Sequence, residues 1–144
     1  MSEAPPLKHI ACIDDDEDIL RVAELTLELM GGFKVTTFSS GPAALAGLAA
    51  AAPDLVLLDV MMPKMDGPAT FEAMQKRDDL KTLPVVFLTA KIQPSERRAY
   101  EAMGAAGVLA KPFDPTTLAQ DIARIWQGWP ELSRTIRDRD RKSA

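Results

Sequence analysis

The stretch Leu55–Gly67, LVLLDVMMPKMDG, puts an aspartate at the end of a predicted buried strand. Its first four residues are all apolar, which is typical of a strand in a parallel sheet with both faces covered. Asp59 follows directly, and a proline and an Asp-Gly pair then turn the chain. A carboxylate placed there loses water, which is costly unless a partner compensates the charge. The rest of the sequence is therefore expected to supply a partner for Asp59.

The composition favours a single globular domain. The chain has 144 residues, enough for one hydrophobic core. It has no run approaching the ~20 apolar residues that span a bilayer, and its N-terminus lacks the apolar segment of a secretory signal. Cys12 is the only cysteine, so it forms no internal disulfide and is expected in the core. We therefore expect a cytoplasmic protein with no membrane partner.

The charge distribution argues against nucleic acid as a partner. The formal net charge is −4. Residues 131–144 contain five basic and three acidic residues, so residues 1–130 carry −6. A nucleic-acid-binding domain requires a concentrated basic face, and the body of this chain is acidic instead.

Strand-like and helix-like segments alternate along the chain. The strands are predicted at 9–13, 33–38, 55–58, 84–90 and 107–110. The helices are predicted at 17–30, 41–52, 68–77, 94–103 and from a cap at Asp114 to about Trp126. The first helix carries Ile19, Leu20, Ala23, Leu27 and Met30 at helical spacing, and Gly31–Gly32 ends it. This alternation predicts an α/β fold: a doubly wound five-stranded parallel sheet with flanking helices on both faces.

Polar residues follow several of these strands directly. They are Asp14, Asp15 and Asp16 after the first strand, Asp59 after the third, Thr89 in the fourth and Lys111 after the fifth. Taken singly, each has an ordinary explanation; acidic residues, for example, favour a helix N-terminus, and Asp16 is best interpreted as such a cap. Ligands of doubly wound sheets bind outside the carboxyl ends of the strands. Polar residues at the ends of four strands therefore predict a binding site at this edge of the sheet.

The residue types indicate phosphoryl chemistry. Clustered carboxylates repel one another unless a cation intervenes, and hard oxygen ligands suit Mg²⁺. A carboxylate beside that metal can attack phosphorus and form an acyl phosphate. Lys111 would neutralise phosphoryl oxygens, and the Thr89 hydroxyl would donate a hydrogen bond to one of them. Asp59 is thus the predicted acceptor.

Four stretches together resemble the receiver domains of two-component response regulators: IACIDDDEDI, LVLLDVMMPKMDG, VVFLTA and GVLAKPF. The resemblance covers residues 7–127 and suggests a single-domain receiver, with residues 1–6 and 128–144 as short flexible termini. It implies a flavodoxin-like (βα)5 fold, with the strands in the order 2-1-3-4-5.

The resemblance also implies residue roles. Asp59 is the phosphorylated aspartate, and Mg²⁺ is held by Asp14, Asp15, Asp59 and the backbone carbonyl of Met61. Thr89 is the switch hydroxyl and Lys111 the phosphate-binding lysine, with a cis peptide bond between Lys111 and Pro112. The phosphoryl donor would be a sensor histidine kinase or a histidine phosphotransfer protein.

Phosphorylation is expected to change the face formed by the helix at 94–103, the strand at 107–110 and the last helix. That face would bind an output partner, which the sequence does not identify, and its mixed charges would also suit a homodimer. Apart from self-phosphorylation and self-dephosphorylation, no enzymatic activity is expected.

Two positions depart from the family pattern. Val108 stands where the family carries a switch aromatic residue, so the coupling to the output face is expected to use another residue or a weaker movement. Met61 and Lys91 occupy the positions that tune the lifetime of the acyl phosphate, and a methionine cannot orient a water, so no fast self-hydrolysis is expected.

Two other functions compete with a phosphorylated receiver. One is an aspartyl-phosphate phosphohydrolase, which would need a second acid where Met61 stands. The other is a non-phosphorylated docking module, which would not require so costly a cluster of charges.

Overall fold

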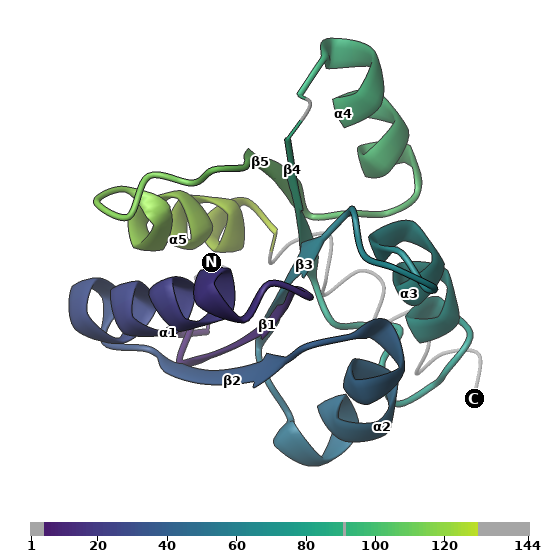
Figure 1. Cartoon of the computed structure of the whole chain (residues 1–144), viewed down its shortest axis with the longest axis horizontal. Coiled ribbons are helices and arrows are strands. Elements are labelled where there is room, and N and C mark those ends of the chain that lie inside the picture. Colours follow the sequence, from purple (N-terminus) through teal and green to yellow (C-terminus); the bar gives the residue numbers. More distant parts are fainter. Residues whose placement is uncertain (1–4, 91, 130–144) are drawn as a thin grey trace.

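The computed structural model describes residues 5–90 and 92–129, and these form five alternating β/α units (Figure 1). The elements are β1 (His9–Ile13), α1 (Glu17–Gly31), β2 (Lys34–Phe38), α2 (Gly41–Ala51), β3 (Leu55–Asp59), α3 (Gly67–Gln75), β4 (Val85–Thr89), α4 (Pro94–Ala102), β5 (Gly107–Ala110) and α5 (Leu118–Gly128). No helix in this part of the chain is both long enough and apolar enough to cross a bilayer.

The strands form one parallel sheet in the order β2-β1-β3-β4-β5, which confirms the predicted fold. The three inner strands are buried along their whole length, whereas the edge strand β2 is half-exposed. The helices α1 and α5 cover one face of the sheet, and α2, α3 and α4 lie on the other (Figure 1).

The core has two halves because successive side chains of a strand point to opposite faces. On β1, Ala11 and Ile13 join the half beneath α2 and α3, whereas Ile10 and Cys12 join the half beneath α1 and α5. Cys12 is therefore in the core, as predicted. Burial raises the pKa of its thiol to about 12, so the sulfur stays protonated at neutral pH.

The first helix has the predicted ends. The Asp16 side chain accepts hydrogen bonds from the backbone N–H groups of Asp18 and Ile19, and Gly32 closes the helix in the left-handed conformation with φ 69°. The predicted apolar face is correct for Leu20, Ala23 and Leu27. It is wrong for Met30, whose side chain is 60% exposed.

The last helix begins later than predicted. α5 starts at Leu118 after Thr117, and neither Thr117 nor Asp114 caps it with a side chain. The Asp114 carboxylate instead accepts hydrogen bonds from Thr116 N at 2.9 Å and Thr116 Oγ1 at 2.7 Å. Asp114 thus caps the turn that leads into α5, because its carbonyl oxygen also accepts from Leu118 N, and only the predicted start of the helix is wrong.

The described parts of the two termini lie close together. Trp126 of α5 donates a hydrogen bond from Nε1 to the Pro5 carbonyl oxygen at 2.6 Å. Residues 1–4 and 130–144, which make up most of the termini predicted to be flexible, lie outside the described residues. The domain limits 7–127 therefore stay a prediction.

Candidate functional site

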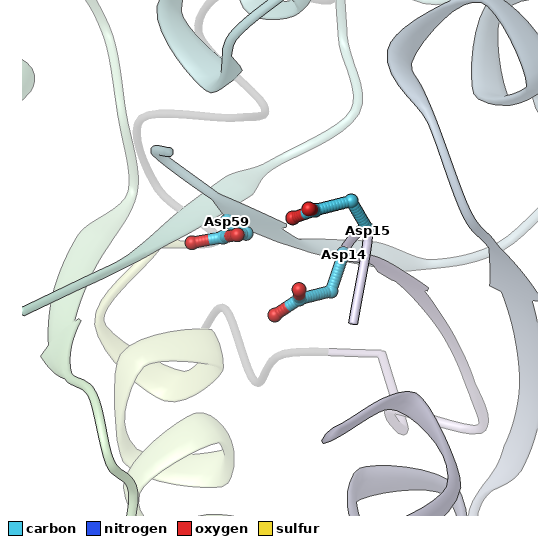
Figure 2. Close-up of side chains that lie close together, drawn as sticks. All are labelled: Asp14, Asp15 and Asp59. Carbon is cyan, nitrogen blue, oxygen red and sulfur yellow. The ribbon is translucent and has the colours of Figure 1, made fainter. Parts of the chain in front are cut away.

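Three aspartates meet at the carboxyl ends of the two central strands (Figure 2). Asp14 and Asp15 follow β1, and Asp59 is the last residue of β3, which pairs with β1. One carboxylate oxygen of each lies within 4.8 Å of the others. Asp14 and Asp59 are buried and Asp15 is exposed. Pairing of the two strands is thus what brings these acids together.

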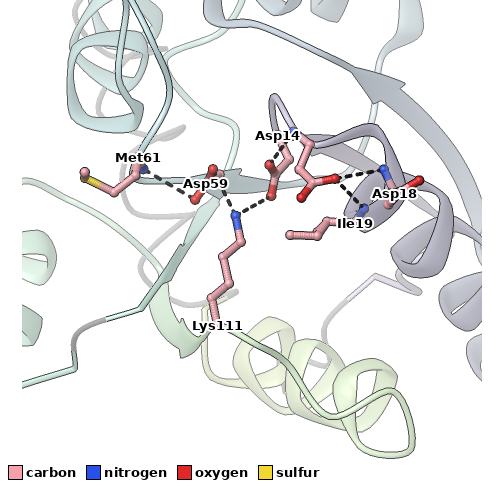
Figure 3. A network of polar contacts seen from close by, with 7 residues as sticks. Asp14, Asp18, Ile19, Asp59, Met61 and Lys111 are labelled. Atoms are coloured by element: carbon pink, nitrogen blue, oxygen red, sulfur yellow. Dashed lines mark hydrogen bonds and ion pairs between the residues drawn. The ribbon is translucent and has the colours of Figure 1, made fainter.

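Lys111, the residue directly after β5, completes this cluster at the same edge of the sheet. Its Nζ lies 3.0 Å from Asp14 Oδ2 and 3.2 Å from Asp59 Oδ2 (Figure 3). The Lys111 backbone N–H donates to the Thr89 carbonyl oxygen at 2.9 Å, which ties the end of β5 to the end of β4. The Lys111–Pro112 peptide bond is cis, as predicted. Lys111 is therefore a partner for the buried charge of Asp59.

The surroundings of the cluster raise the pKa values of both Asp59 and Lys111. Burial and, next, repulsion from Asp14 raise the pKa of Asp59 to about 6, although Lys111 and the Met61 N–H oppose this shift. Burial disfavours the charged form of Lys111, but its contacts with Asp14 and Asp59 outweigh that effect and raise the pKa of the lysine. One lysine thus only partly compensates for the loss of water around these buried acids.

The oxygen atoms of the cluster fit a hard divalent cation. Asp59 Oδ2 is only in ion-pair contact with Lys111; it is buried and accepts no directed hydrogen bond within the described part of the chain. Asp14 and Asp15 add two more carboxylates beside it. Mg²⁺ takes oxygen ligands, typically one or two carboxylates with waters and phosphate. The donor set therefore matches the predicted cofactor.

Thr89 and Met61 lie at the rim of the cluster. Thr89 is the buried last residue of β4, one position beyond Leu88, the partner of Asp59 in the sheet. Met61 N–H lies 3.4 Å from Asp59 Oδ1, and its side chain is 75% exposed. Lys91, the other residue predicted to tune phosphate lifetime, lies outside the described residues.

Gly67 supports the site in a way that was not predicted from the sequence. Its N–H donates to Val60 O at 2.9 Å, and Asp66 caps α3 by accepting from Ala69 N. A Cβ atom at position 67 would collide with the backbone carbonyl oxygen of Asp59. The Asp-Gly pair therefore does more than turn the chain, because it lets α3 begin directly against the backbone of Asp59.

A mostly apolar cleft of about 550 Å³ opens beside Asp59. It is lined by Asp18, Ile19, Val22, Asp59, Met61, Ala90, Lys111, Pro112, Phe113 and Pro115. These residues come from α1, from the end of β3 and from the loops after β3, β4 and β5. No local sequence pattern predicts this cleft, because only the folded sheet edge joins segments so far apart along the chain.

The chain matches known proteins along most of its length. Residues 10–123 match the response regulator receiver domain family. The probable transcriptional regulator ycf27 of Cyanophora paradoxa is 36% identical over 118 residues, which cover 82% of this chain and 48% of that protein. The sensor histidine kinase GacS of Pseudomonas protegens is 36% identical over 130 residues, 88% of this chain and 14% of the kinase. The chain thus spans at most about half of these two relatives.

Comparison with solved structures points to the same family. The chemotaxis response regulator CheY4 of Vibrio cholerae superposes with a TM-score of 0.76 and 32% identity, covering 83% of this chain and 99% of CheY4. The fold and the site therefore define a receiver domain. This chain belongs to the response regulator receiver domain family, a component of two-component signalling.

Proposed function

We propose that this receiver domain accepts a phosphoryl group on Asp59 and acts as a phosphorylation-dependent switch. The observation that carries the proposal is the buried Asp59 carboxylate, which faces Asp14, Asp15 and Lys111 at one edge of the sheet. A buried charge of this kind lowers the stability of the fold, so its presence favours a functional role over a structural one. Its pKa of about 6 still leaves most of the carboxylate ionised at neutral pH, as a nucleophile requires.

The reaction is the transfer of a phosphoryl group from a phosphohistidine. An Asp59 oxygen forms a bond to phosphorus while the bond between phosphorus and the histidine nitrogen breaks. The bonding electron pair returns to the imidazole, and Asp59 becomes an acyl phosphate. Lys111 Nζ lies close enough to Asp59 to pair with a phosphoryl oxygen, and Thr89 is proposed to donate a hydrogen bond to another.

Asp14, Asp15, Asp59 and the Met61 carbonyl would hold Mg²⁺. When bound, this cation would offset the negative charge that gathers on the phosphoryl oxygens and carboxylates. The crowding of Asp14, Asp15 and Asp59 supports this assignment, because three acids served by one lysine retain excess negative charge.

The phosphoryl donor must dock over the apolar cleft beside Asp59. The proposed donor is a sensor histidine kinase or a histidine phosphotransfer protein, and one relative of this chain is itself a sensor histidine kinase. The surface of the donor that carries the phosphohistidine would cover side chains such as Ile19, Val22 and Phe113. Burial of such apolar surface stabilises a complex and excludes water from the reacting atoms.

The output of the switch would be a change in the face formed by α4, β5 and α5. Arg97, Glu101, Asp121 and Arg124 surround a hollow of about 400 Å³ on this face. A protein partner, or a second copy of the chain, is proposed to bind there. We also propose a cytoplasmic location and the domain limits 7–127.

The test is the intact mass of the protein after incubation with Mg²⁺ and acetyl phosphate. We expect one phosphate adduct, which is lost in Asp59→Asn and when Mg²⁺ is chelated. Asp78→Asn, which changes an exposed carboxylate with no part in the site, is the matched control and should keep the adduct. If no adduct forms while another receiver domain is labelled in parallel, a docking role without phosphorylation replaces the proposal.

A further inference from the structure

Tyr100, the only tyrosine of the chain, connects α4 with the strand that ends at Thr89. Its ring packs against Phe87 of β4, with ring centroids 4.9 Å apart and planes inclined by 43°. Phe87 and Thr89 are two residues apart on one strand, so their side chains point to the same face of the sheet. Tyr100 therefore approaches β4 on the face where Thr89 lies.

α4 has few other attachments to the body of the domain. None of its residues is buried, and Gln93 at its N-terminus makes no capping hydrogen bond through its side chain. Within the helix bounds, only Tyr100 packs as a partly buried apolar side chain against the core. A shift of the Tyr100 ring would therefore be passed on to the whole helix.

The hydroxyl group of Tyr100 meets the side chain of Thr89. Burial and the nearby Glu96 raise the pKa of Tyr100, whereas a side-chain hydrogen bond with Thr89 lowers it. A threonine hydroxyl has a single proton but can accept more than one hydrogen bond. Thr89 can therefore donate to Tyr100 or to a phosphoryl oxygen, but not to both at once.

We propose that Tyr100 is the positioning residue that couples the Thr89 hydroxyl, and through it the state of Asp59, to the position of α4. This rests on the function proposed above. Once Thr89 donates to a phosphoryl oxygen, its bond to Tyr100 persists only if Tyr100 becomes the donor. That reversal turns the Tyr100 O–H toward Thr89, and movement of Thr89 toward the phosphoryl oxygen then draws the hydrogen-bonded ring along Phe87. Val108, which lies beside Phe87 on β5, has no polar group with which to do this.

The first test uses nuclear magnetic resonance of the full chain with ¹³C-labelled tyrosine rings. A single tyrosine gives one set of ring signals, and the phosphate adduct is measured by intact mass in the same samples. We expect the ring signals to shift when acetyl phosphate and Mg²⁺ produce the adduct. In Thr89→Val, the signals should differ from wild type before phosphorylation, and the further shift should be lost.

The second test uses Tyr100→Phe, which keeps the ring packed on Phe87 and removes only the hydroxyl. Phosphorylation should change backbone hydrogen exchange in residues 94–102 of the wild type and of Ser95→Ala, an exposed residue of the same helix outside the proposed output hollow. In phosphorylated Tyr100→Phe that change should be lost.

The outcomes separate this inference from the proposed function. Absence of the adduct in the wild type overturns both. An adduct without a shift of the ring signals, or with an unchanged exchange response in Tyr100→Phe, overturns the role of Tyr100 alone and leaves the phosphoacceptor proposal intact.

Discussion

Asp59 is held in its ionised form at the expense of fold stability. Its side chain is 2% exposed, and burial together with Asp14 raises its pKa to about 6, above its usual 3.8. The folded state therefore binds a proton more tightly than the unfolded state does. The stabilising effect of that proton is complete below pH 3.8 and is lost as the pH rises through about 6.

Replacing the charge should therefore stabilise the metal-free protein. At pH 7 with a chelator, we expect Asp59→Asn to raise the free energy of unfolding by on the order of 1–3 kcal/mol, measured by urea denaturation. Mg²⁺ should stabilise the wild type and have much less effect on the variant. Asp78→Asn, whose carboxylate is 98% exposed, should be almost neutral. A variant less stable than the wild type would contradict this account of Asp59.

The contribution of His9 to the free energy of unfolding should depend on pH in the opposite sense to that of Asp59. It is buried on β1 with Nε2 2.7 Å from Thr36 Oγ1. Burial and the charge of Lys34 hold the pKa of His9 below its usual 6.5, so the unfolded state gains the proton first as the pH falls. This contribution to stability is present above pH 6.5 and is lost at lower pH.

The variant His9→Gln isolates this effect because His9 is the only histidine in the chain. We expect the difference in unfolding free energy between wild type and variant to shrink or reverse between pH 7.5 and pH 5.5, measured by urea denaturation. Asp59 titrates in the same range but is common to both proteins, so it cancels in the comparison. A difference that stays constant with pH would show that His9 titrates alike in the folded and unfolded states.

At the scale of the elements, Gly32 ends α1 by a backbone conformation that side chains rarely adopt. Its φ is 69°, and a Cβ atom there would meet no atom within 4 Å. Gly32→Ala should therefore lower the free energy of unfolding by about 1 kcal/mol through backbone strain alone. Gly128→Ala is the matched control, because that Cβ would also enter open space, but on a helical residue without positive φ. Equal effects of the two substitutions in thermal unfolding would refute the explanation.

Elements with one dominant local signal were predictable from the sequence. It was possible to predict β1 and β3 from their apolar runs, and the acids that follow these runs indicated that Asp59 lies at the end of a strand. The start of α5 was mispredicted because Asp114 followed by Pro115 suits a tight turn as well as a helix cap. Met30 was mispredicted because helical spacing does not reveal which side chains of the last turn of α1 point away from α5.

At the scale of the whole molecule, the contacts that the sequence could not predict join distant segments. The cleft beside Asp59 needs α1 and three loops together, and the contact of Tyr100 with Phe87 needs α4 to fold back over β4. Neither leaves a local pattern, because the cleft depends on pairing of the strands and the ring contact depends on packing of α4 against the sheet. The edge of a parallel sheet was predictable as a site only because all strands end on the same side of it.

The contact between Trp126 and Pro5 ties the start of the chain to its last helix, and it tests the predicted domain limits. Deleting residues 1–6 should leave Trp126 Nε1, which donates to Pro5 O at 2.6 Å, without its acceptor and lower the free energy of unfolding by about 1–2 kcal/mol. In a Trp126→Phe background, the same deletion should have a smaller effect, since no donor is left unpaired. Urea denaturation of the four proteins measures this coupling. If the deletion has no effect on wild type, the folded domain begins at Leu7, as the sequence predicted; the expected loss would place its start at Pro5 or earlier.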